Sequence, residues 1–152
     1  MLFRSGYIAF NNSPKLGPIR ENLPKLARVR ISTNLPVQHA ALESLRGPQG
    51  YVSEFVSELK KRRDFVVNRL NSISGLSCSV PKGAFYAFPK IENNPYKTDQ
   101  EFVMELLRKT GVLTVHGSGF GAKYGSGHFR IVFLPDIKTL DFALNEIEKF
   151  CQ

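Results

Sequence analysis

The sequence predicts an α/β domain, a two-layer sandwich of helices on a sheet, that begins near residue 50. The first observation is a long segment, from about Tyr51 to Ile73, with apolar residues at helical spacing. The second is a set of short β-type runs after it, and the third is a pair of further helical segments between and behind those runs. The resulting order of helix, two strands, helix, two strands and helix is typical of such a sandwich.

A short apolar run, Gly6–Phe10, lies ahead of this domain and is predicted to be a strand. The turn-forming residues 11–14 (Asn-Asn-Ser-Pro) end it. A single strand needs partners, and the next β-type run is far away in the sequence. We therefore interpret this run as the last strand of a sheet whose other strands are missing.

Two helices are predicted between this strand and the sandwich. Residues from Ile19 to Ile31 have a roughly helical pattern, and Pro24 within it should kink or divide the helix because proline lacks a backbone donor. A shorter helix is predicted from Val37 to Leu45, with Pro36 before it and Gly47 after it.

The helices of the sandwich have clear apolar faces. The helix from about Tyr51 to Ile73 should lie across the sheet through Val52, Phe55, Val56, Leu59, Val66, Leu70 and Ile73. Thr98 and Glu101 have the spacing of a capping box, which predicts a helix that ends at Gly111. A last helix is predicted from about Leu140 to Phe150. The four strands of the sheet are expected at Leu76–Val80, Ala84–Phe88, Val112–Val115 and Phe129–Phe133.

Composition indicates an ordinary globular protein. Apolar residues make up 42% and charged residues 22% of the 152 residues, and no apolar stretch reaches the roughly 20 residues that span a bilayer. The N-terminus lacks the features of a secretory signal, so we expect a cytoplasmic protein with no membrane partner. Cys78 and Cys151 are expected to be reduced thiols. The three histidines lack metal-ligand spacing, and no serine or cysteine can be tied to a base, so neither a metal site nor a hydrolytic triad is expected.

The net charge of +8 suggests an anionic partner, either nucleic acid or a phosphorylated ligand. Its densest source, Lys60–Arg63, is consecutive on a predicted helix and therefore fans around it, which favours a solvated helix surface. No aromatic-rich nucleic-acid motif accompanies it. We expect no nucleic-acid partner; the alternative of binding through the basic surface predicts an affinity that falls steeply with salt.

Residues His116–Ala122 form a glycine-rich segment that follows a predicted strand. It contains the pattern Gly-x-Gly-x-x-Ala, but a dinucleotide fingerprint must open a helix, and residues 123–127 are expected to continue as loop. Two interpretations remain: a flexible turn without a ligand, or a loop that lines a pocket. Five glycines within eleven residues favour the pocket, because glycine lets the backbone approach a ligand closely.

Two arginines are candidates for binding an anion. Arg130 begins an otherwise apolar strand, and a buried guanidinium is costly unless a carboxylate or phosphate pairs with it. The alternative for Arg130 is a structural salt bridge within the domain. Arg4 stands just before the strand Gly6–Phe10, where the alternative is a surface residue at a frayed terminus.

Several segments, in order, resemble the class I/II aminotransferases of the fold-type I pyridoxal-phosphate group, particularly the alanine aminotransferase branch. The resemblance covers nearly the whole chain. The segments that carry it are Phe3-Arg4-Ser5-Gly6-Tyr7, Thr33-Asn34-Leu35-Pro36-Val37-Gln38, Lys61-Arg62-Arg63-Asp64, Pro81-Lys82-Gly83-Ala84-Phe85-Tyr86, His116-Gly117-Ser118-Gly119-Phe120-Gly121 and His128-Phe129-Arg130.

The resemblance assigns roles to individual residues. Arg130 matches the arginine that clamps the substrate α-carboxylate, and the loop with Gly117, Ser118 and Gly119 matches the one that borders the substrate. Arg4 matches the arginine that binds the phosphate of pyridoxal phosphate. These roles agree with the anion that Arg130 requires on chemical grounds.

The resemblance also implies a division of the chain and an intact enzyme. Residues 1–35 would be a remnant of the large cofactor-binding domain with its connecting helix, and residues 36–152 the C-terminal small domain, which resembles that of fold-type I aminotransferases. In family dimers the segment that matches Asn34 approaches the neighbouring subunit's active site, so the intact enzyme is expected to be a homodimer.

In the family, the Schiff-base lysine lies a few residues before the position of Arg4, and the chain begins too late to contain it. We therefore expect no catalytic residue in this chain and no activity from the chain alone. The missing N-terminal portion would complete an enzyme that moves an amino group between an amino acid and a 2-oxo acid. The alternative is a non-catalytic binding or interaction module derived from the small domain.

Overall fold

The computed structural model describes residues 6–29 and 33–152. The chain divides into two compact units, Met1–Tyr51 and Val52–Gln152. The second unit begins close to residue 50, where the sequence predicts the start of the sandwich. The assignment of residues 1–35 to a large domain is not tested by this division and stays a prediction.

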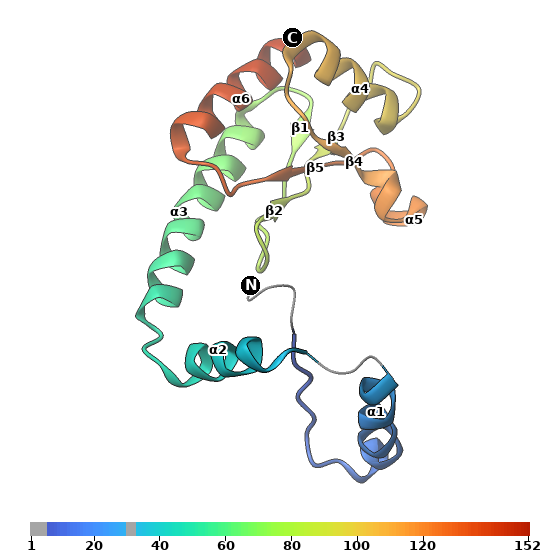
Figure 1. Cartoon of the computed structure of the whole chain (residues 1–152). Helices are drawn as coiled ribbons and strands as arrows, with labels where there is room; N and C mark the ends of the chain where they lie inside the picture. Colours follow the sequence, from blue (N-terminus) through green and yellow to red (C-terminus); the bar gives the residue numbers. More distant parts are fainter. Residues whose placement is uncertain (1–5, 30–32) are drawn as a thin grey trace. The chain divides into compact units, whose positions relative to one another are not determined.

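The first unit contains a short 3₁₀ helix, Pro14–Leu16, and helices α1 (Gly17–Val29) and α2 (Leu35–Arg46) (Figure 1). The two predicted α-helices are present. Pro24 does not divide α1, which is one continuous helix. None of the residues in α1 is buried, so water can bond the carbonyl group that has lost its donor.

The predicted strand at Gly6–Phe10 is absent: these residues are described but belong to no strand. Tyr7 and Ile8 are 75% and 65% exposed. The physical reason is that a strand is stabilised by ladder hydrogen bonds, and no segment in the described part of the chain pairs with residues 6–10.

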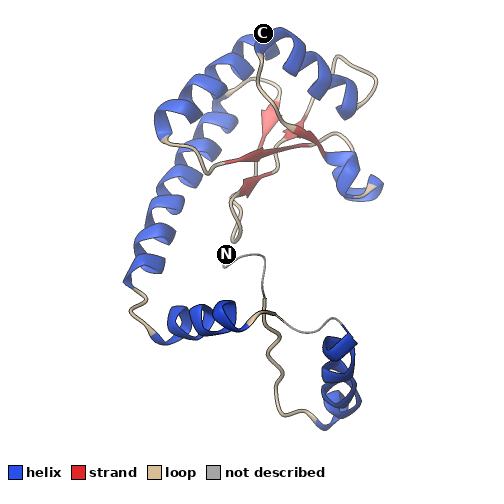
Figure 2. Cartoon of the chain, viewed as in Figure 1, coloured by secondary structure: helices blue, strands red, loops and turns tan. Residues whose placement is uncertain are grey.

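Three long helices form the helical layer of the second unit: α3 (Gly50–Ser72, which begins at the boundary), α4 (Asp99–Thr110) and α6 (Ile137–Cys151) (Figure 2). All three were predicted, and local chemistry explains where two of them begin. The Thr98 side chain accepts a hydrogen bond from the Glu101 N–H, and the Asp136 carboxylate accepts one from the Thr139 N–H. Helix α4 ends at Gly111, whose φ of 75° lies in the left-handed region that glycine adopts without strain.

Five short strands lie against these helices: β1 (Leu76–Ser77), β2 (Tyr86–Ala87), β3 (Lys90–Ile91), β4 (Val115–His116) and β5 (Phe129–Val132). They form two antiparallel sheets, β1-β3 and β2-β5-β4, where the sequence predicted one sheet. An isolated bridge between Lys90 and His128 connects them. Three of the four predicted strands are found in shortened form, the strand predicted at Val112–Val115 is shifted to Val115–His116, and β3 was missed.

The side chain of Asn71 explains why β1 stops at Ser77. Its amide nitrogen donates to the Cys78 carbonyl at 3.0 Å, and its amide oxygen accepts from the Cys78 N–H at 2.7 Å. Both backbone groups of Cys78 are therefore satisfied by a helix side chain and not by a neighbouring strand.

The core lies between the three long helices and the strands. It includes Val66 and Leu70 of α3, Phe102 of α4, Leu144 of α6 and Phe129 of β5. The predicted apolar face of α3 is buried only in its second half. In the first half, the side chains that remain exposed are Val52, Phe55 and Val56.

The basic cluster Lys60–Arg63 lies on α3 and pairs largely with acids of the same helix. Lys61 and Arg62 contact Glu58 at 3.7 and 3.2 Å, and Arg63 contacts Asp64 at 2.6 Å. In the part of the chain that the structure describes, no helix is both long and apolar enough to cross a bilayer.

Candidate functional site

Arg130 is the second residue of β5, and its position is set by the strand register. Phe129 is fully buried on the helical side of the sheet, so alternation places the Arg130 side chain on the other face. Tyr86 pairs with Val132, which puts the Tyr86 side chain on the same face as Arg130 and two residues away along the neighbouring strand.

Two aromatic rings contact the guanidinium group of Arg130. Its Cζ lies 4.4 Å from the centre of the Tyr86 ring and 4.4 Å from the centre of the Phe120 ring. Both distances are within the range of cation–π attraction. Tyr86 and Phe120 are called the aromatic clamp below.

The guanidinium has no anionic partner among the described residues. Its Nε atom is buried and has no hydrogen-bond acceptor, and no described carboxylate forms an ion pair with Arg130. The alternative of a structural salt bridge is therefore not what the structure shows. A buried donor without an acceptor is costly, and a carboxylate would satisfy it.

The glycine-rich segment is more regular than the sequence indicated. Gly117–Phe120 form a 3₁₀ helix, η2, and Ala122–Gly125 form a helical turn, α5, where loop was expected. The Ser118 N–H donates to Asp99 Oδ2 at 2.7 Å, and the Gly119 N–H donates to His116 Nδ1 at 3.2 Å. These bonds give the segment a defined conformation, which argues against the flexible-turn interpretation.

Gly117 and Gly125 lie back to back in this segment. A Cβ atom on Gly117 would collide with the carbonyl oxygen of Gly125, and one on Gly125 would collide with the carbonyl oxygen of Gly117. Gly117 is buried, so it serves close backbone packing, whereas Ser118 is half-buried and Gly119 is exposed.

Gly117→Ala is therefore expected to destabilise the chain by about 1–3 kcal/mol, the usual cost of forcing an extra carbon into a packed site. The check is the free energy of unfolding from a urea titration. Gly83→Ala is the control, since a Cβ there meets no atom within 4 Å and its φ is not positive. Equal losses in the two variants would contradict the packing role of Gly117.

The chain matches a known protein family over nearly its whole length. Residues 2–147 match the sequence profile of "Aminotransferase class I and II". The chain belongs to this aminotransferase family.

Individual aminotransferases are similar over most of the chain. A glutamate-pyruvate aminotransferase, AlaA, of Haemophilus influenzae is 37% identical over 97% of this chain, and an alanine aminotransferase of Mycobacterium bovis is 32% identical over 97% of it. The solved alanine aminotransferase of Pyrococcus furiosus superimposes with a TM-score of 0.87 at 50% identity over 93% of this chain. An Escherichia coli aminotransferase gives a TM-score of 0.80 at 34% identity over 93% of it.

The chain spans only part of these relatives. It covers 38% of the Haemophilus influenzae aminotransferase, 35% of the Mycobacterium bovis protein and 36% of each of the two solved chains. These matches agree with the sequence-based interpretation that the chain is the C-terminal portion of a fold-type I aminotransferase.

The sequence also assigned roles to Arg4 and Asn34. Arg4, the predicted phosphate ligand, lies outside the described residues. The Asn34 side chain accepts a hydrogen bond from the Val37 N–H at 3.1 Å and so caps α2. The predicted approach of Asn34 to a neighbouring subunit stays a prediction.

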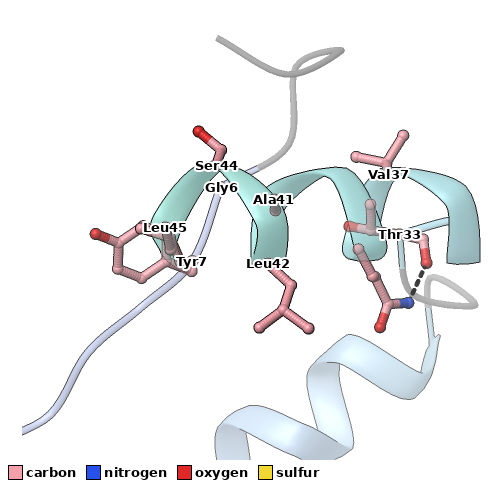
Figure 3. A pocket seen from close by; sticks show the side chains of 9 residues that line it. Gly6, Tyr7, Thr33, Val37, Ala41, Leu42, Ser44 and Leu45 are labelled. Atoms are coloured by element: carbon pink, nitrogen blue, oxygen red, sulfur yellow. Dashed lines mark hydrogen bonds between the residues drawn. The ribbon is translucent and has the colours of Figure 1, made fainter. Parts of the chain in front are cut away.

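A separate cavity lies within the first unit of this aminotransferase chain. It has a volume of about 420 Å³ and is lined by Gly6 and Tyr7 together with one side of α2, as Figure 3 shows. Gln38 and Thr33 also line it, and the Gln38 amide nitrogen donates to the Thr33 carbonyl at 2.6 Å. Its lining has no arginine, lysine or carboxylate, so it offers no charge to a substrate carboxylate.

The described residues hold no cluster of histidine, cysteine and acidic side chains suited to a metal ion. Cys78 and Cys151 are free thiols. Burial raises the pKa of Cys151 to about 11, so this thiol is neutral at physiological pH.

Sequence reasoning missed two residues that contact Arg130, Tyr86 and Phe120, and also Asp99, which bonds the neighbouring η2. Tyr86 and Phe120 belong to segments that carry the family resemblance, but their contact with Arg130 depends on strand register and on the shape of η2. The signal for Asp99 was the capping-box spacing of Thr98 and Glu101, which places Asp99 in the first turn of a helix.

Proposed function

We propose that the intact protein transfers an amino group between an amino acid and a 2-oxo acid, and that this chain binds the substrate α-carboxylate through Arg130. One observation supports this role: the Nε atom of Arg130 is buried and has no hydrogen-bond acceptor among the described residues, while the aromatic clamp lies against the guanidinium. The names of the similar proteins, glutamate-pyruvate and alanine aminotransferase, support the reaction class.

The planar guanidinium matches the geometry of a carboxylate. Two parallel N–H groups can donate to the two carboxylate oxygens, which fixes the orientation of the substrate as well as its charge. The rings of Tyr86 and Phe120 lie against the guanidinium, so the substrate approaches its N–H edge. Ser118 and Gly119 lie in η2 within two residues of Phe120, which contacts Arg130, so they are placed to border the substrate.

Pyridoxal phosphate, when bound in the intact enzyme, supplies an electron sink for the bonds at the substrate Cα. The chemistry of Arg130 fits the substrate end of such a site, because its guanidinium has no carboxylate partner among the described residues and its Nε has no acceptor. The phosphate end belongs to Arg4 in this proposal. Because the chain spans only 38% of a related aminotransferase, the proposal places the lysine that anchors the cofactor and moves the proton in the part of the protein that these 152 residues do not cover, and the 152-residue chain is not expected to transaminate by itself.

The same proposal includes a homodimer, with Asn34 near the neighbouring subunit's site, and a cytoplasmic location. The homodimer is supported only by the resemblance to the aminotransferase family. The cytoplasmic location is supported by the free thiols of Cys78 and Cys151.

Carboxylate binding can be tested on the 152-residue chain with ¹⁵N NMR of the arginine Nε–H groups. Titration with pyruvate is expected to shift the Arg130 signal, with a Kd on the order of 1–10 mM for a single ion pair in a partly open site. Methyl pyruvate, which lacks the carboxylate, should leave the signal in place. Arg130→Gln should abolish the response of the chain to pyruvate.

Arg108→Gln is the matched control, because Arg108 is an exposed arginine that pairs with Glu105 at 2.6 Å. This variant should respond to pyruvate as the unmodified chain does. If pyruvate and methyl pyruvate shift Arg130 equally, or if pyruvate shifts Arg108 as much as Arg130, the proposed carboxylate site is wrong.

A further inference from the structure

Asp99 is the one charged residue that is buried among residues 6–29 and 33–152, with a side chain and backbone only 4% exposed. It is the first residue of α4 and forms no salt bridge within that described part. Its carboxylate is bonded instead by the Ser118 N–H, 19 residues further along the chain, at 2.7 Å. Burying a carboxylate without a salt-bridge partner is unfavourable unless hydrogen bonds compensate, so the bond from Ser118 is important for stabilising Asp99 in this place.

The hydrogen bonds keep this carboxylate ionised. Burial raises the pKa of Asp99, but hydrogen bonds from the backbone and hydroxyl of Ser118, a bond from its own backbone and the nearby His116 together lower the net pKa below its usual value. The position of Asp99 in the first turn of α4 also favours a negative charge. A charged acceptor makes a stronger bond to an N–H than a neutral one.

Asp99 is not required to cap its own helix. Thr98 is the N-cap of α4, and its side chain accepts from the Glu101 N–H at 3.0 Å. The Asp99 carboxylate bonds outward, to η2. Asp99 therefore connects η2 to a helix that is fixed in the core through Phe102 and Leu106.

The connection reaches Arg130 in two short steps. Ser118 lies two residues before Phe120 in η2, and the Phe120 ring lies 4.4 Å from the Arg130 guanidinium carbon. The Phe120 ring is more than half exposed and meets Phe88 edge to face at 6.1 Å, so little core packing holds it in place. The hydrogen bond from the Ser118 N–H to Asp99 ties η2 to α4, and the Gly117 N–H donates to the His128 carbonyl at 2.8 Å, which ties the start of η2 to the residue before β5.

We propose that Asp99 is a positioning residue, which holds η2 so that Phe120 stays against Arg130 and the guanidinium keeps the orientation needed for a carboxylate. This inference rests on the proposed role of Arg130 in carboxylate binding. It adds that the affinity for the substrate carboxylate depends on Asp99, although Asp99 contacts neither the substrate nor Arg130.

The test compares Asp99→Ala, Asp99→Asn and Thr98→Ala in the ¹⁵N-labelled 152-residue chain. Three quantities are measured: the exchange rate of the Ser118 amide, the nuclear Overhauser contacts between the Phe120 ring and the Arg130 side chain, and the Kd for pyruvate. Asp99→Ala is expected to speed Ser118 exchange and to weaken pyruvate binding by about tenfold each, the effect of losing one charge-assisted hydrogen bond, and to remove the contacts between Phe120 and Arg130.

Asp99→Asn keeps an oxygen of the same size at the same place. It can still accept from the Ser118 N–H, so all three quantities should stay within about threefold of those of the unmodified chain, as for a weaker neutral hydrogen bond. Thr98→Ala removes the helix cap but leaves Asp99 in place. It should lower stability without changing the contacts between Phe120 and Arg130.

The outcomes separate this inference from the proposed function. If the unmodified chain does not bind pyruvate, the carboxylate site fails, while Ser118 exchange and the ring contacts still test whether Asp99 positions Phe120. Unchanged exchange and contacts in Asp99→Ala overturn the inference, as does an equal effect of Thr98→Ala. Should Asp99→Ala not fold, the folded Asp99→Asn chain takes its place: Ser118 exchange faster by much more than threefold, with unchanged ring contacts, overturns the inference.

Discussion

Replacing Arg130 by lysine is expected to lower kcat/KM for transamination about ten- to a hundredfold in the proposed intact aminotransferase. Lysine keeps the positive charge but loses the planar pair of donors, so a single point contact would hold the substrate carboxylate. Loss of a bidentate, charge-assisted interaction costs about 1.5–3 kcal/mol. A lysine ammonium also has no flat face to lie along the rings of Tyr86 and Phe120.

Kinetics and thermal unfolding of the same variant distinguish the two roles of Arg130. A substrate role predicts a large fall in kcat/KM for both the amino acid and the 2-oxo acid, with Tm nearly unchanged. Arg108→Lys, at an exposed pair with Glu105, should leave both quantities unchanged. Normal kinetics with a lowered Tm in Arg130→Lys would remove Arg130 from the substrate site.

Phe102→Ala is expected to lower the free energy of unfolding by about 3–5 kcal/mol, the range for deleting a buried aromatic side chain. Phe102 is 2% exposed, and its ring centre lies 5.4 Å from that of Phe129, 5.2 Å from that of Phe150 and 6.1 Å from that of Tyr96. The ring therefore joins α4 to β5 and α6, and its removal opens a cavity between them.

The measurement is urea denaturation followed by circular dichroism. Phe142→Ala is the matched control in the same unit: Phe142 is 66% exposed on α6, and its loss should cost under about 0.5 kcal/mol. A loss below about 1 kcal/mol for Phe102→Ala would show that the contacts among these rings do not support the core.

The helices were predictable because their signals are local. The apolar spacing of α3, the threonine cap of α4 and the left-handed glycine at its end are each contained within a few residues of the element that they define. The exposed first half of α3 was not predictable, because periodicity identifies an apolar face but does not identify what covers it.

The strands were harder to predict because they depend on distant partners. The run Gly6–Phe10 has strand composition but meets no partner among the described residues, and β1 is cut short by the side chain of Asn71. Strand β3, Lys90–Ile91, is only two residues long and carries a charged side chain, so it gives no alternating pattern. A single segment can have the composition of a strand, but it forms a strand only when a second segment pairs with it.

The place of Arg130 in an apolar strand was predictable from the sequence, whereas its substrate role stays a proposal. Its surroundings were not predictable. Tyr86 precedes Arg130 by 44 residues and contacts it because β2 pairs with β5. Phe120 contacts it because the glycine-rich segment forms a 3₁₀ helix, which the sequence did not indicate. Asp99 had no sequence signal beyond its place beside a helix cap.

The aromatic clamp also bears on the thermodynamics of ligand binding. A long side chain such as arginine loses up to about 2 kcal/mol of rotamer entropy when it is fixed in one conformation. The rings of Tyr86 and Phe120, which belong to the chain itself, lie against the Arg130 guanidinium and restrict its rotamers. That entropy is therefore lost when the chain folds and not when a carboxylate arrives, so a ligand that is itself rigid can bind with little further loss of freedom on the protein side.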